Sequence, residues 1–399
     1  MSPSSSATKS TRVILLRHGQ STFNERKLYQ GCSDESLLNE VGTKQANLSG
    51  EFLKNCDDDI DLIYASPLQR THATAIEICK VISADTNHLL PINLHPNLKE
   101  INLPSWQGLP FKYVRENLRK EYRMWEETPH EFTLETITSS GATLVKAQTK
   151  PVIELYQKAA EFWQEILPQY PGKTILIVSH GGTIRALIST ALGINPSLFH
   201  RIQQSNCGIS ILNFHNHVNS ELNHDFDEII TFPQLEAINL TQHLNEQLPK
   251  LKNGKHGLRL ILLPINSANS QINPSRLHQI IQSSNINFCI SCNLDDIHQE
   301  QINQILEQNS TKPIANLQVS LQNFFPLWHR TICNSNRNTN SLNTGIVVAD
   351  TETIRSIFHQ ILDIESNSPK IDIQSDKISL IFYPSSQDSP VIQAMNICL

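Results

Sequence analysis

Two residues with phosphate chemistry stand together near the start of this sequence. Arg17 and His18 follow a short apolar run at residues 13–16, and Gly19 comes next. A guanidinium offers a planar fork of donors that suits phosphate, and an imidazole can act as a nucleophile or base near neutral pH. Glycine lets the backbone pass close to a ligand. We therefore predict a phosphate site at the end of this apolar run.

The elements that must position these groups recur in one order, which is a buried strand, a polar loop and a helix. This alternation indicates an α/β fold with a mostly parallel sheet, whose site lies where the strands end. Arg70, Glu100 and His180 lie in or beside later loops of the same kind. We predict strands at residues 13–16, 60–65, 174–179 and 209–214, and helices at residues 40–53, 66–81, 111–127, 144–167 and 183–192.

Two of the predicted helices begin with capping residues. Asn39 is the expected N-cap of the helix at residues 40–53. Ser66 is the expected N-cap of the helix at residues 66–81, with Pro67 at its first position. Arg70 then lies on the first turn, where exposed amides and the helix dipole also favour a bound anion.

Four motifs in this order resemble the histidine phosphatase superfamily, which includes the phosphoglycerate mutases. The resemblance covers residues 11–214, about half of the chain, and implies a three-layer α/β sandwich. It also implies phosphate transfer through a phosphohistidine. The motifs are Leu-Arg-His-Gly-Gln-Ser-Thr-Phe-Asn at residues 16–24, Ser-Pro-Leu-Gln-Arg-Thr at 66–71, Leu-Lys-Glu at 98–100 and Val-Ser-His-Gly-Gly at 178–182.

Transfer through a histidine needs a neutral imidazole, fixed positive donors around the phosphoryl oxygens, and an acid for the leaving alcohol. We assign His18 as the nucleophile and Glu100 as the acid, which later activates water. Arg17, Arg70 and His180 would hold the phosphoryl oxygens. No metal or other cofactor is predicted, because the positive groups belong to the chain.

Short polar loop residues near the motifs are predicted substrate contacts. Ser21 and Asn24 would meet the phosphate, and the loop at residues 30–32 would meet the rest of the substrate. Arg185 is expected to be structural or at the surface. The predicted contacts are Ser21, Asn24, Gln30, Gly31, Cys32 and Gly181.

A narrower resemblance is to the plant and cyanobacterial 2-carboxy-D-arabinitol-1-phosphatases. Residues 17–22, 105–109, 124–132 and 204–212 carry it. It implies a phosphatase that acts on small sugar phosphates or phosphorylated sugar acids, including those that block Rubisco. A phosphoglycerate mutase is the alternative within the enzyme class. The alternative from another class is a regulatory protein that binds a phosphorylated ligand without turnover.

The second half of the chain resembles the first half. Residues 12–19 align with 259–266, residues 175–185 with 345–355, residues 61–70 with 287–296, and residues 208–212 with 377–381. We infer an internal duplication. The chemistry is lost in the second copy, because the aligned residues there are Pro264 for Arg17, Ile265 for His18, Asp296 for Arg70 and Asp350 for His180.

Length and composition set the remaining expectations. The 399 residues suffice for two domains, and a net charge of −6 gives no argument for a nucleic acid or membrane partner. We predict a disordered tail at residues 1–10, a catalytic domain at 11–215, a linker at 216–257 with helix around 235–248, and a degenerate, inactive domain at 258–399. A homodimer is possible for such a second domain.

The eight cysteines are scattered along the chain. We read them as reduced thiols in a cytoplasmic protein. Cys289 and Cys292 have the spacing of a metal or redox pair, but they lie in an apolar run without a second pair. Core thiols are therefore the preferred interpretation.

Overall fold

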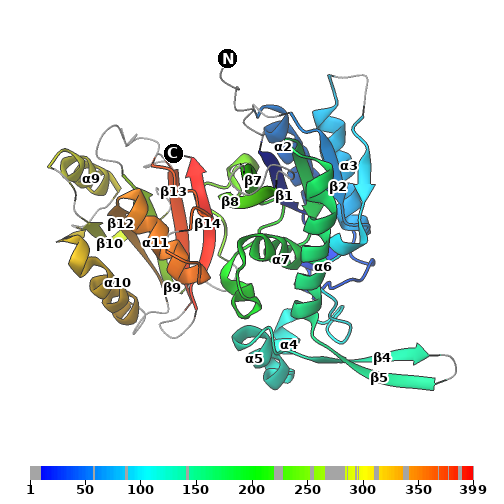
Figure 1. Ribbon diagram of the computed structural model, residues 1–399. Helices are drawn as coiled ribbons and strands as arrows, with labels where there is room; N and C mark the ends of the chain where they lie inside the picture. Colours follow the sequence, from blue (N-terminus) through cyan, green and yellow to red (C-terminus); the bar gives the residue numbers. More distant parts are fainter. Residues whose placement is uncertain are drawn as a thin grey trace, which may run out of the picture. The chain divides into compact units, whose positions relative to one another are not determined.

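The computed structural model divides the chain into two compact units (Figure 1). The N-terminal unit comprises Met1–His200 and Gln204–Leu235, and the C-terminal unit comprises Arg201–Gln203 and Glu236–Leu399. The predicted tail lies outside the described residues, apart from Ser10. The structure describes residues 10–56, 59–85, 89–140, 143–219, 228–251, 256–265, 284, 286–292, 294, 296–309, 314–335, 341–366, 368–375, 377–384 and 389–398.

The sheet of the N-terminal unit is mostly parallel, as predicted. Strand β1 (Thr11–Arg17) pairs in parallel with β6 (Thr174–Ser179), which pairs in parallel with β2 (Leu62–Ala65). Beyond β2 follows β3 (Ile92–Leu94), while β7 (Ile209–Asn219) runs antiparallel on the other side of β1. The parallel strands end at one edge of the sheet, so the loops that follow them converge there.

Helices pack in pairs around this sheet and give the predicted three layers. α2 (Glu40–Lys54) packs on α3 (Gln69–Ile82), and α6 (Pro151–Ile166) packs on α7 (Gly181–Leu192). The apolar runs of β1 and β6 are almost fully buried, as expected of parallel strands covered on both faces. The sheet is therefore a rigid base for the loops at its edge.

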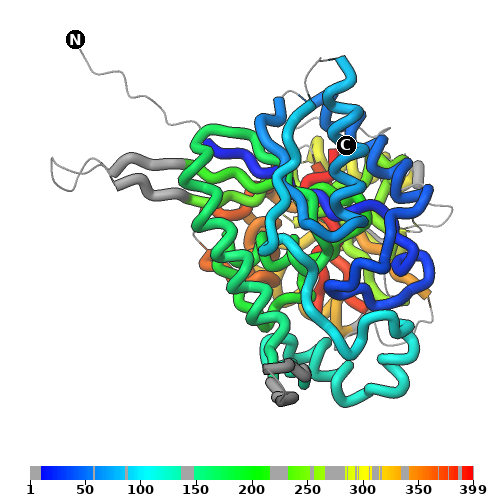
Figure 2. Tube along the Cα trace, turned by 90° about the vertical axis from the view of Figure 1, so that its right-hand side faces the viewer, coloured from blue at the N-terminus to red at the C-terminus, as the bar shows by residue number. Residues whose placement is uncertain are grey.

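A long insertion follows the third strand. The helices α4 (Phe111–Asn117) and α5 (Arg119–Glu127), which we call the cap helices, lead into a hairpin of β4 (Leu134–Ser140) and β5 (Thr143–Thr149). Figure 1 shows the hairpin extending away from the sheet, and Figure 2 also places the cap helices at the end of the unit where α6 begins. Short helices complete the unit: α1 (Thr22–Glu25), η1 (Pro96–Leu98), η2 (Leu167–Gln169) and most of η3 (Pro196–Arg201).

Two predicted helices are wrong in part. The helix predicted at residues 144–167 is strand β5 up to Thr149, and α6 begins only at Pro151. Proline suits the first turn of a helix because its missing N–H is not needed there. The helix predicted at residues 111–127 is interrupted at Leu118, whose φ of −110° and ψ of 47° are not helical. The predicted Asn39 cap is confirmed, since its side chain accepts a hydrogen bond from Gly42 N at 2.9 Å.

The C-terminal unit repeats the strand pairing of the N-terminal unit, which confirms the predicted second copy of the fold. β9 (Gly257–Pro264) pairs in parallel with β12 (Leu342–Ala349), which pairs in parallel with β10 (Ile286–Cys292). β11 (Ala315–Val319) continues the parallel set, and β13 (Lys377–Tyr383) runs antiparallel to β9. Its other elements are β14 (Val391–Cys398), α9 (Asp296–Asn309), α10 (Leu321–Ser335) and α11 (Thr351–Leu362).

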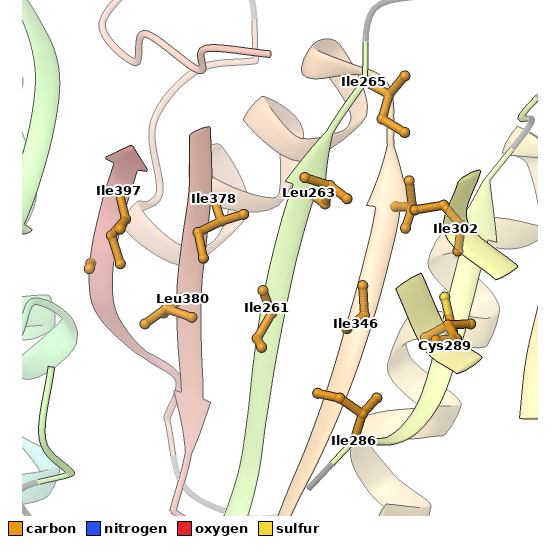
Figure 3. Close-up of a cluster of buried hydrophobic side chains, with 13 residues drawn as sticks. Ile261, Leu263, Ile265, Ile286, Cys289, Ile302, Ile346, Ile378, Leu380 and Ile397 are labelled. Atoms are coloured by element: carbon orange, nitrogen blue, oxygen red, sulfur yellow. The ribbon is translucent and has the colours of Figure 1, made fainter. Parts of the chain in front are cut away.

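An apolar core joins the strands of this second sheet to α9. Figure 3 shows Ile261, Ile346 and Leu380 on neighbouring strands, with Ile302 of α9 beside them. Cys289 belongs to the same cluster, and both it and Cys292 are buried. All eight cysteines are free, so the interpretation of this pair as core thiols is confirmed.

The predicted linker contains a strand where we expected a helix. β8 (Glu228–Leu240) occupies residues assigned to the start of that helix, and only a short turn, η4 (Gln242–Leu244), follows it. Leu235, Ala237 and Ile238 are buried, and Ile238 pairs with Met395 of β14. Pairing with a neighbouring strand thus overrides the helical spacing of the apolar residues. The boundary between the two units also falls within this strand.

Candidate active site

The two histidines are neighbours because the strands that carry them are paired. Arg17 at the end of β1 lies opposite Ser179 at the end of β6, and His18 N donates to Ser179 O at 2.9 Å. His18 and His180 therefore leave the sheet side by side, with ring centroids 5.2 Å apart. Both side chains are buried, at 1% and 0% exposure. The predicted convergence at the strand ends is present.

His18 is held as a neutral imidazole with one free nitrogen. Its Nδ1 lies 2.7 Å from Gly19 O, and a carbonyl only accepts, so Nδ1 must carry the proton. The lone pair is then on Nε2. Burial, followed by the nearby charges of Arg17 and Arg70, lowers the pKa of His18 well below its ordinary value. The imidazole thus stays neutral, and the lone pair on Nε2 is suited to nucleophilic attack.

The loop after His18 passes too close to α2 for a side chain. A Cβ on Gly19 would lie 2.5 Å from Gly42 O, a backbone atom that cannot swing away. Gly19 N donates to Thr74 Oγ1 on α3 at 3.1 Å. The glycine therefore fixes the path of the chain that carries His18.

Arg17 keeps its charge although it is buried. Burial lowers its pKa to about 10, while Glu100 opposes that change. Its Nη1 donates to Gln204 O at 2.9 Å. A Cβ on Gly181 would lie 3.4 Å from Arg17 Nε, so the first turn of α7 runs along this guanidinium.

Arg70 is fully buried and holds the loop after α1. Its Nη1 donates to Ser33 O at 2.8 Å, and its Nη2 donates to Gly31 O at 3.0 Å. Gly31 has a positive φ of 49°, which glycine adopts most readily. The guanidinium thus ties the predicted substrate loop to the sheet edge.

The predicted cap of the helix that carries Arg70 is wrong. α3 begins at Gln69, after Leu68, which provides no side-chain cap. Asp34 from the preceding loop accepts from Gln69 N at 2.7 Å, so a carboxylate occupies the amide that we expected to help bind phosphate. Ser66 instead lies with its Oγ 2.8 Å from His180 Nε2. Since α3 begins at Gln69, Ser66 is too early in the chain to cap it.

Three buried donors at the site have no hydrogen-bond partner within the described part of the chain. They are Arg17 Nε, Arg70 Nε and, in the tautomer whose Nε2 accepts from Ser66 Oγ, His180 Nδ1. The other ring nitrogen of His180 contacts Ser66 Oγ and, at 3.1 Å, Thr71 Oγ1. Buried donors are rarely left unpaired, because each costs about 1–3 kcal/mol. Three of them next to His18 can donate together to one anion.

Glu100 lies at the start of α7 with its carboxylate fixed by amides. Ile101 N donates to Oε1 at 2.9 Å, and Gly182 N donates to Oε2 at 3.3 Å. A Cβ on Gly182 would collide with this carboxylate. The side chain is half-buried, so it can exchange protons with substrate and water. Glu100 thus stands at the rim of the group of His18, Arg17 and His180.

The predicted substrate contacts form a network that shapes the rim of the site. Ser21 caps α1 and donates to Gln30 Oε1 at 2.9 Å, and Asn24 Oδ1 accepts from Asn206 Nδ2 at 3.0 Å. Cys32 Sγ donates to Glu100 O at 2.8 Å. These contacts hold the loop beside His18 and Glu100, and direct binding of substrate by these residues stays a prediction.

The sequence did not indicate that residues 206 and 207, which are distant from His18 in the chain, support the backbone of Arg17 and His18. Asn206 Nδ2 donates to His18 O at 3.0 Å, and Cys207 N donates to Arg17 O at 2.9 Å. The run at residues 204–212 was noticed only as part of a resemblance. Arg185 was expected to be structural or at the surface. Its side chain is half-buried, and its Cζ lies 5.4 Å from the centroid of the Phe199 ring.

Two further properties of the described residues bear on function. None of their His, Cys, Asp and Glu side chains form a group of three or more that could hold a metal ion. No helix among them is long and apolar enough to cross a membrane.

Comparison with known proteins identifies relatives of the first half of the chain. It is 36% identical over 203 residues to a probable 2-carboxy-D-arabinitol-1-phosphatase of Arabidopsis thaliana, covering 51% of this chain and 38% of that protein. It is 28% identical over 235 residues to phosphoserine phosphatase 1 of Hydrogenobacter thermophilus, covering 59% and 95%. The chain thus spans less than two thirds of the length of the arabinitol-phosphatase relative.

Solved structures and a family model match the same region. A crystal structure of phosphoserine phosphatase from Entamoeba histolytica with 3-phosphoglyceric acid is 28% identical, with a TM-score of 0.43, and the match covers 59% of this chain and 99% of that chain. The model of the histidine phosphatase superfamily (branch 1) matches residues 13–224. Since this match takes in more than half of the 399 residues, the chain belongs to the histidine phosphatase superfamily.

Proposed function

We propose that this protein is a metal-independent phosphomonoesterase that works through a phosphohistidine on His18. The observation that carries the proposal is the group of unpaired buried donors on Arg17, Arg70 and His180 around a neutral His18. A phosphoryl group next to His18 Nε2 would satisfy all three. Donors that are already in place stabilise the charge of the transition state without reorganisation.

The residues support a two-step displacement. In the first step His18 Nε2 attacks phosphorus, the ester P–O bond breaks, and protonated Glu100 gives its proton to the leaving alcohol. In the second step Glu100 takes a proton from water, whose oxygen attacks phosphorus while the P–N bond breaks. Free phosphate leaves, and both His18 and Glu100 return to their starting states.

The substrate that we propose is a small phosphorylated sugar or sugar acid, with 2-carboxy-D-arabinitol 1-phosphate among the candidates. The support is the similarity to a probable 2-carboxy-D-arabinitol-1-phosphatase and to a phosphoserine phosphatase, whose names denote small phosphorylated compounds that carry a carboxylate. The cap helices and the loop at residues 30–32 would meet the part of the substrate beyond the phosphate.

We also propose that the C-terminal unit is inactive. Ile265 and Asp350 stand where the N-terminal unit has its two histidines, and Asp350 caps its own helix. An apolar group and a carboxylate give neither a nucleophile nor a donor for a phosphoryl oxygen. The unit would then serve packing, assembly or regulation.

The test compares the full-length protein with His18→Ala on several sugar phosphates and 3-phosphoglycerate. Free phosphate and isomerised product are measured in the same samples. We expect phosphate release that needs His18, whereas His72→Ala, a change two residues past Arg70 on α3, should keep it. Isomerisation without phosphate release would make the protein a mutase. No turnover by a folded wild-type protein would favour a binding protein and refute the proposal.

A further inference from the structure

Arg185 starts from the face of α7 that carries the active site. It lies three residues after Gly182 and four after Gly181, so the three positions share one face of the helix. Gly181 runs along Arg17, and Gly182 runs against the Glu100 carboxylate. Side chains in a helix lean toward its N-terminus. The Arg185 side chain therefore leans back toward the place where these two charged groups meet.

An aromatic cluster that includes a cap helix holds the guanidinium. Arg185 Cζ lies 5.4 Å from the centroid of Phe199, whose ring centroid is 5.7 Å from that of Trp125 on α5. His200 contacts Trp125 both by its ring, at 4.8 Å between centroids, and by a 2.8 Å bond from Nε2 to Trp125 O. A cation over an aromatic face is attracted to it and loses freedom. Arg185 is thus positioned between the sheet edge and the cap.

The charges around Arg185 show what it can recognise. Burial lowers its pKa, while the carboxylates of Glu100 and Glu126 oppose that change. A guanidinium has five donors in a fixed fork, so it can pair with more than one carboxylate at a time. Arg185 also lowers the pKa of Arg17, so its positive charge acts on the predicted phosphate site.

The position of Glu100 indicates how a bound substrate would be oriented. The proposed acid protonates the leaving oxygen, so the leaving alcohol must lie on the Glu100 side of the phosphorus. Arg185 shares the helix face of Gly182, which abuts the Glu100 carboxylate, and the phosphoryl oxygens are already assigned to Arg17, Arg70 and His180. A negative group on the leaving alcohol would therefore reach Arg185 and not the phosphate donors.

We propose that Arg185 is a specificity residue that binds a carboxylate on the leaving alcohol, a few atoms from the phosphorylated carbon. This inference rests on the proposed function and narrows its substrates to phosphorylated sugar acids and hydroxy acids. The cap helix α5 takes part indirectly, because Trp125 packs on the ring that supports the guanidinium.

Two substrates that differ only in the carboxylate provide the test. 3-Phosphoglycerate carries it, and glycerol 3-phosphate has a neutral hydroxymethyl group in its place. We expect the wild-type protein to prefer 3-phosphoglycerate. Arg185→Gln should lower kcat/KM for 3-phosphoglycerate by roughly 10- to 100-fold, mainly through KM, which is the usual range for a lost charged hydrogen bond. The value for glycerol 3-phosphate should change by less than about 3-fold.

Two other variants make the comparison stringent. Arg185→Lys keeps the charge but loses the fork, so it should recover part of the preference for 3-phosphoglycerate. Lys173→Gln removes a cation just before β6, at the end of the strand opposite His180, where it pairs with Asp61, and should leave the kinetics on both substrates unchanged. Circular dichroism and thermal unfolding check that each variant is folded.

The results separate this inference from the proposed function. An equal loss on both substrates, or a pH profile displaced for both, would make Arg185 a structural partner of Glu100 and overturn the inference. Unchanged kinetics, or a wild-type protein without preference, would also overturn it and leave the phosphatase intact. If the wild type releases no phosphate at all, the proposed function fails. In that case calorimetry measures the affinity of the same two compounds for His18→Ala and for His18→Ala/Arg185→Gln. A preference for 3-phosphoglycerate that is lost with Arg185→Gln would support the carboxylate site, and its absence would overturn it.

Discussion

The paired strand ends β1–β6 and β9–β12 have the same backbone geometry and different chemistry. Arg12 lies opposite Thr174 in the first pair, and Arg259 lies opposite Thr344 in the second, as the aligned sequences require. The residue after each first strand makes the same bond. His18 N donates to Ser179 O at 2.9 Å, and Ile265 N donates to Ala349 O at 2.9 Å.

The helices that follow differ at their N-cap, the residue just before the first turn. The side chain of His180, the N-cap of α7, makes no capping hydrogen bond, and the amide of Gly182 donates to Glu100. Asp350 begins α11 and accepts from Thr353 N at 2.7 Å, so this helix satisfies its own first turn. The comparison teaches that strand pairing maintains the fold. The N-terminal unit lacks a side-chain cap at this position, and His180 lies beside His18 instead.

The substitution that tests this difference most strongly is His180→Asp, which places in the N-terminal unit the residue type found at the aligned position of the C-terminal unit. We expect kcat/KM to fall by about 10³-fold or more, because a carboxylate repels the phosphate and removes one of the three unpaired donors. The fold should be kept, since aspartate caps the equivalent helix. Steady-state kinetics and thermal unfolding measure both effects. A folded variant with activity within 10-fold of the wild type would show that His180 is not part of the catalytic group.

Glu100→Gln tests the assigned acid, with a smaller expected effect. Glutamine keeps an acceptor for the amide of Gly182 but cannot give a proton. We expect kcat on an alkyl phosphate to fall by about 10²- to 10⁴-fold, the usual contribution of general acid catalysis. The loss on p-nitrophenyl phosphate should be much smaller, because that leaving group needs no proton. Equal losses on both substrates would assign Glu100 a positioning role.

The sequence predicted the fold because the governing signals are local. Buried parallel strands appear as short apolar runs, and each of the five candidate residues stands next to such a run or in a recognisable motif, while its catalytic role stays a prediction. The second copy was predicted on the same basis. The strand registers then matched the alignment at Arg12 and Arg259.

The failures have one physical cause, which is that contacts distant in sequence decided them. We predicted Ser66 as the cap of the helix that carries Arg70, but Asp34, from a loop distant in the sequence, accepts from Gln69 N at the start of that helix. β8 is a strand because neighbouring strands pair with it, although its apolar spacing also suits a helix. Asn206 bonds to the backbone of His18 although the two residues are far apart in the sequence, and this contact depends on the fold.

The buried histidines predict a dependence of stability on pH. Burial, with the charges of nearby arginines, lowers the pKa values of His18 and His180 well below 6.5. Below pH 6.5 the unfolded chain binds a proton on each histidine, while the folded protein leaves both neutral. The free energy of unfolding should therefore fall as the pH falls from 6.5 toward the folded pKa values, by about 1.4 kcal/mol per pH unit for each histidine.

Urea unfolding at several pH values measures this slope. In His18→Asn/His180→Asn the slope between pH 6.5 and 5 should decrease by up to about 2.7 kcal/mol per pH unit, as two protons no longer contribute. His215→Asn, which changes an exposed histidine of the same unit, should leave the slope unchanged. A double variant with the wild-type slope would mean that both histidines are protonated in the folded protein.

The smallest expected effect belongs to the C-terminal counterpart of His180. Asp350→Ala removes the bonds from Thr353 to the cap of α11 and should lower the free energy of unfolding by about 1 kcal/mol, as for other N-caps. Phosphate release should not change, because the proposed chemistry lies in the N-terminal unit. Asp350→Asn keeps an acceptor for Thr353 N and should recover most of the stability. If Asp350→Ala abolished phosphate release while the protein stayed folded, the second copy would have to contribute to catalysis, and the division between a catalytic and a structural helix start would be wrong.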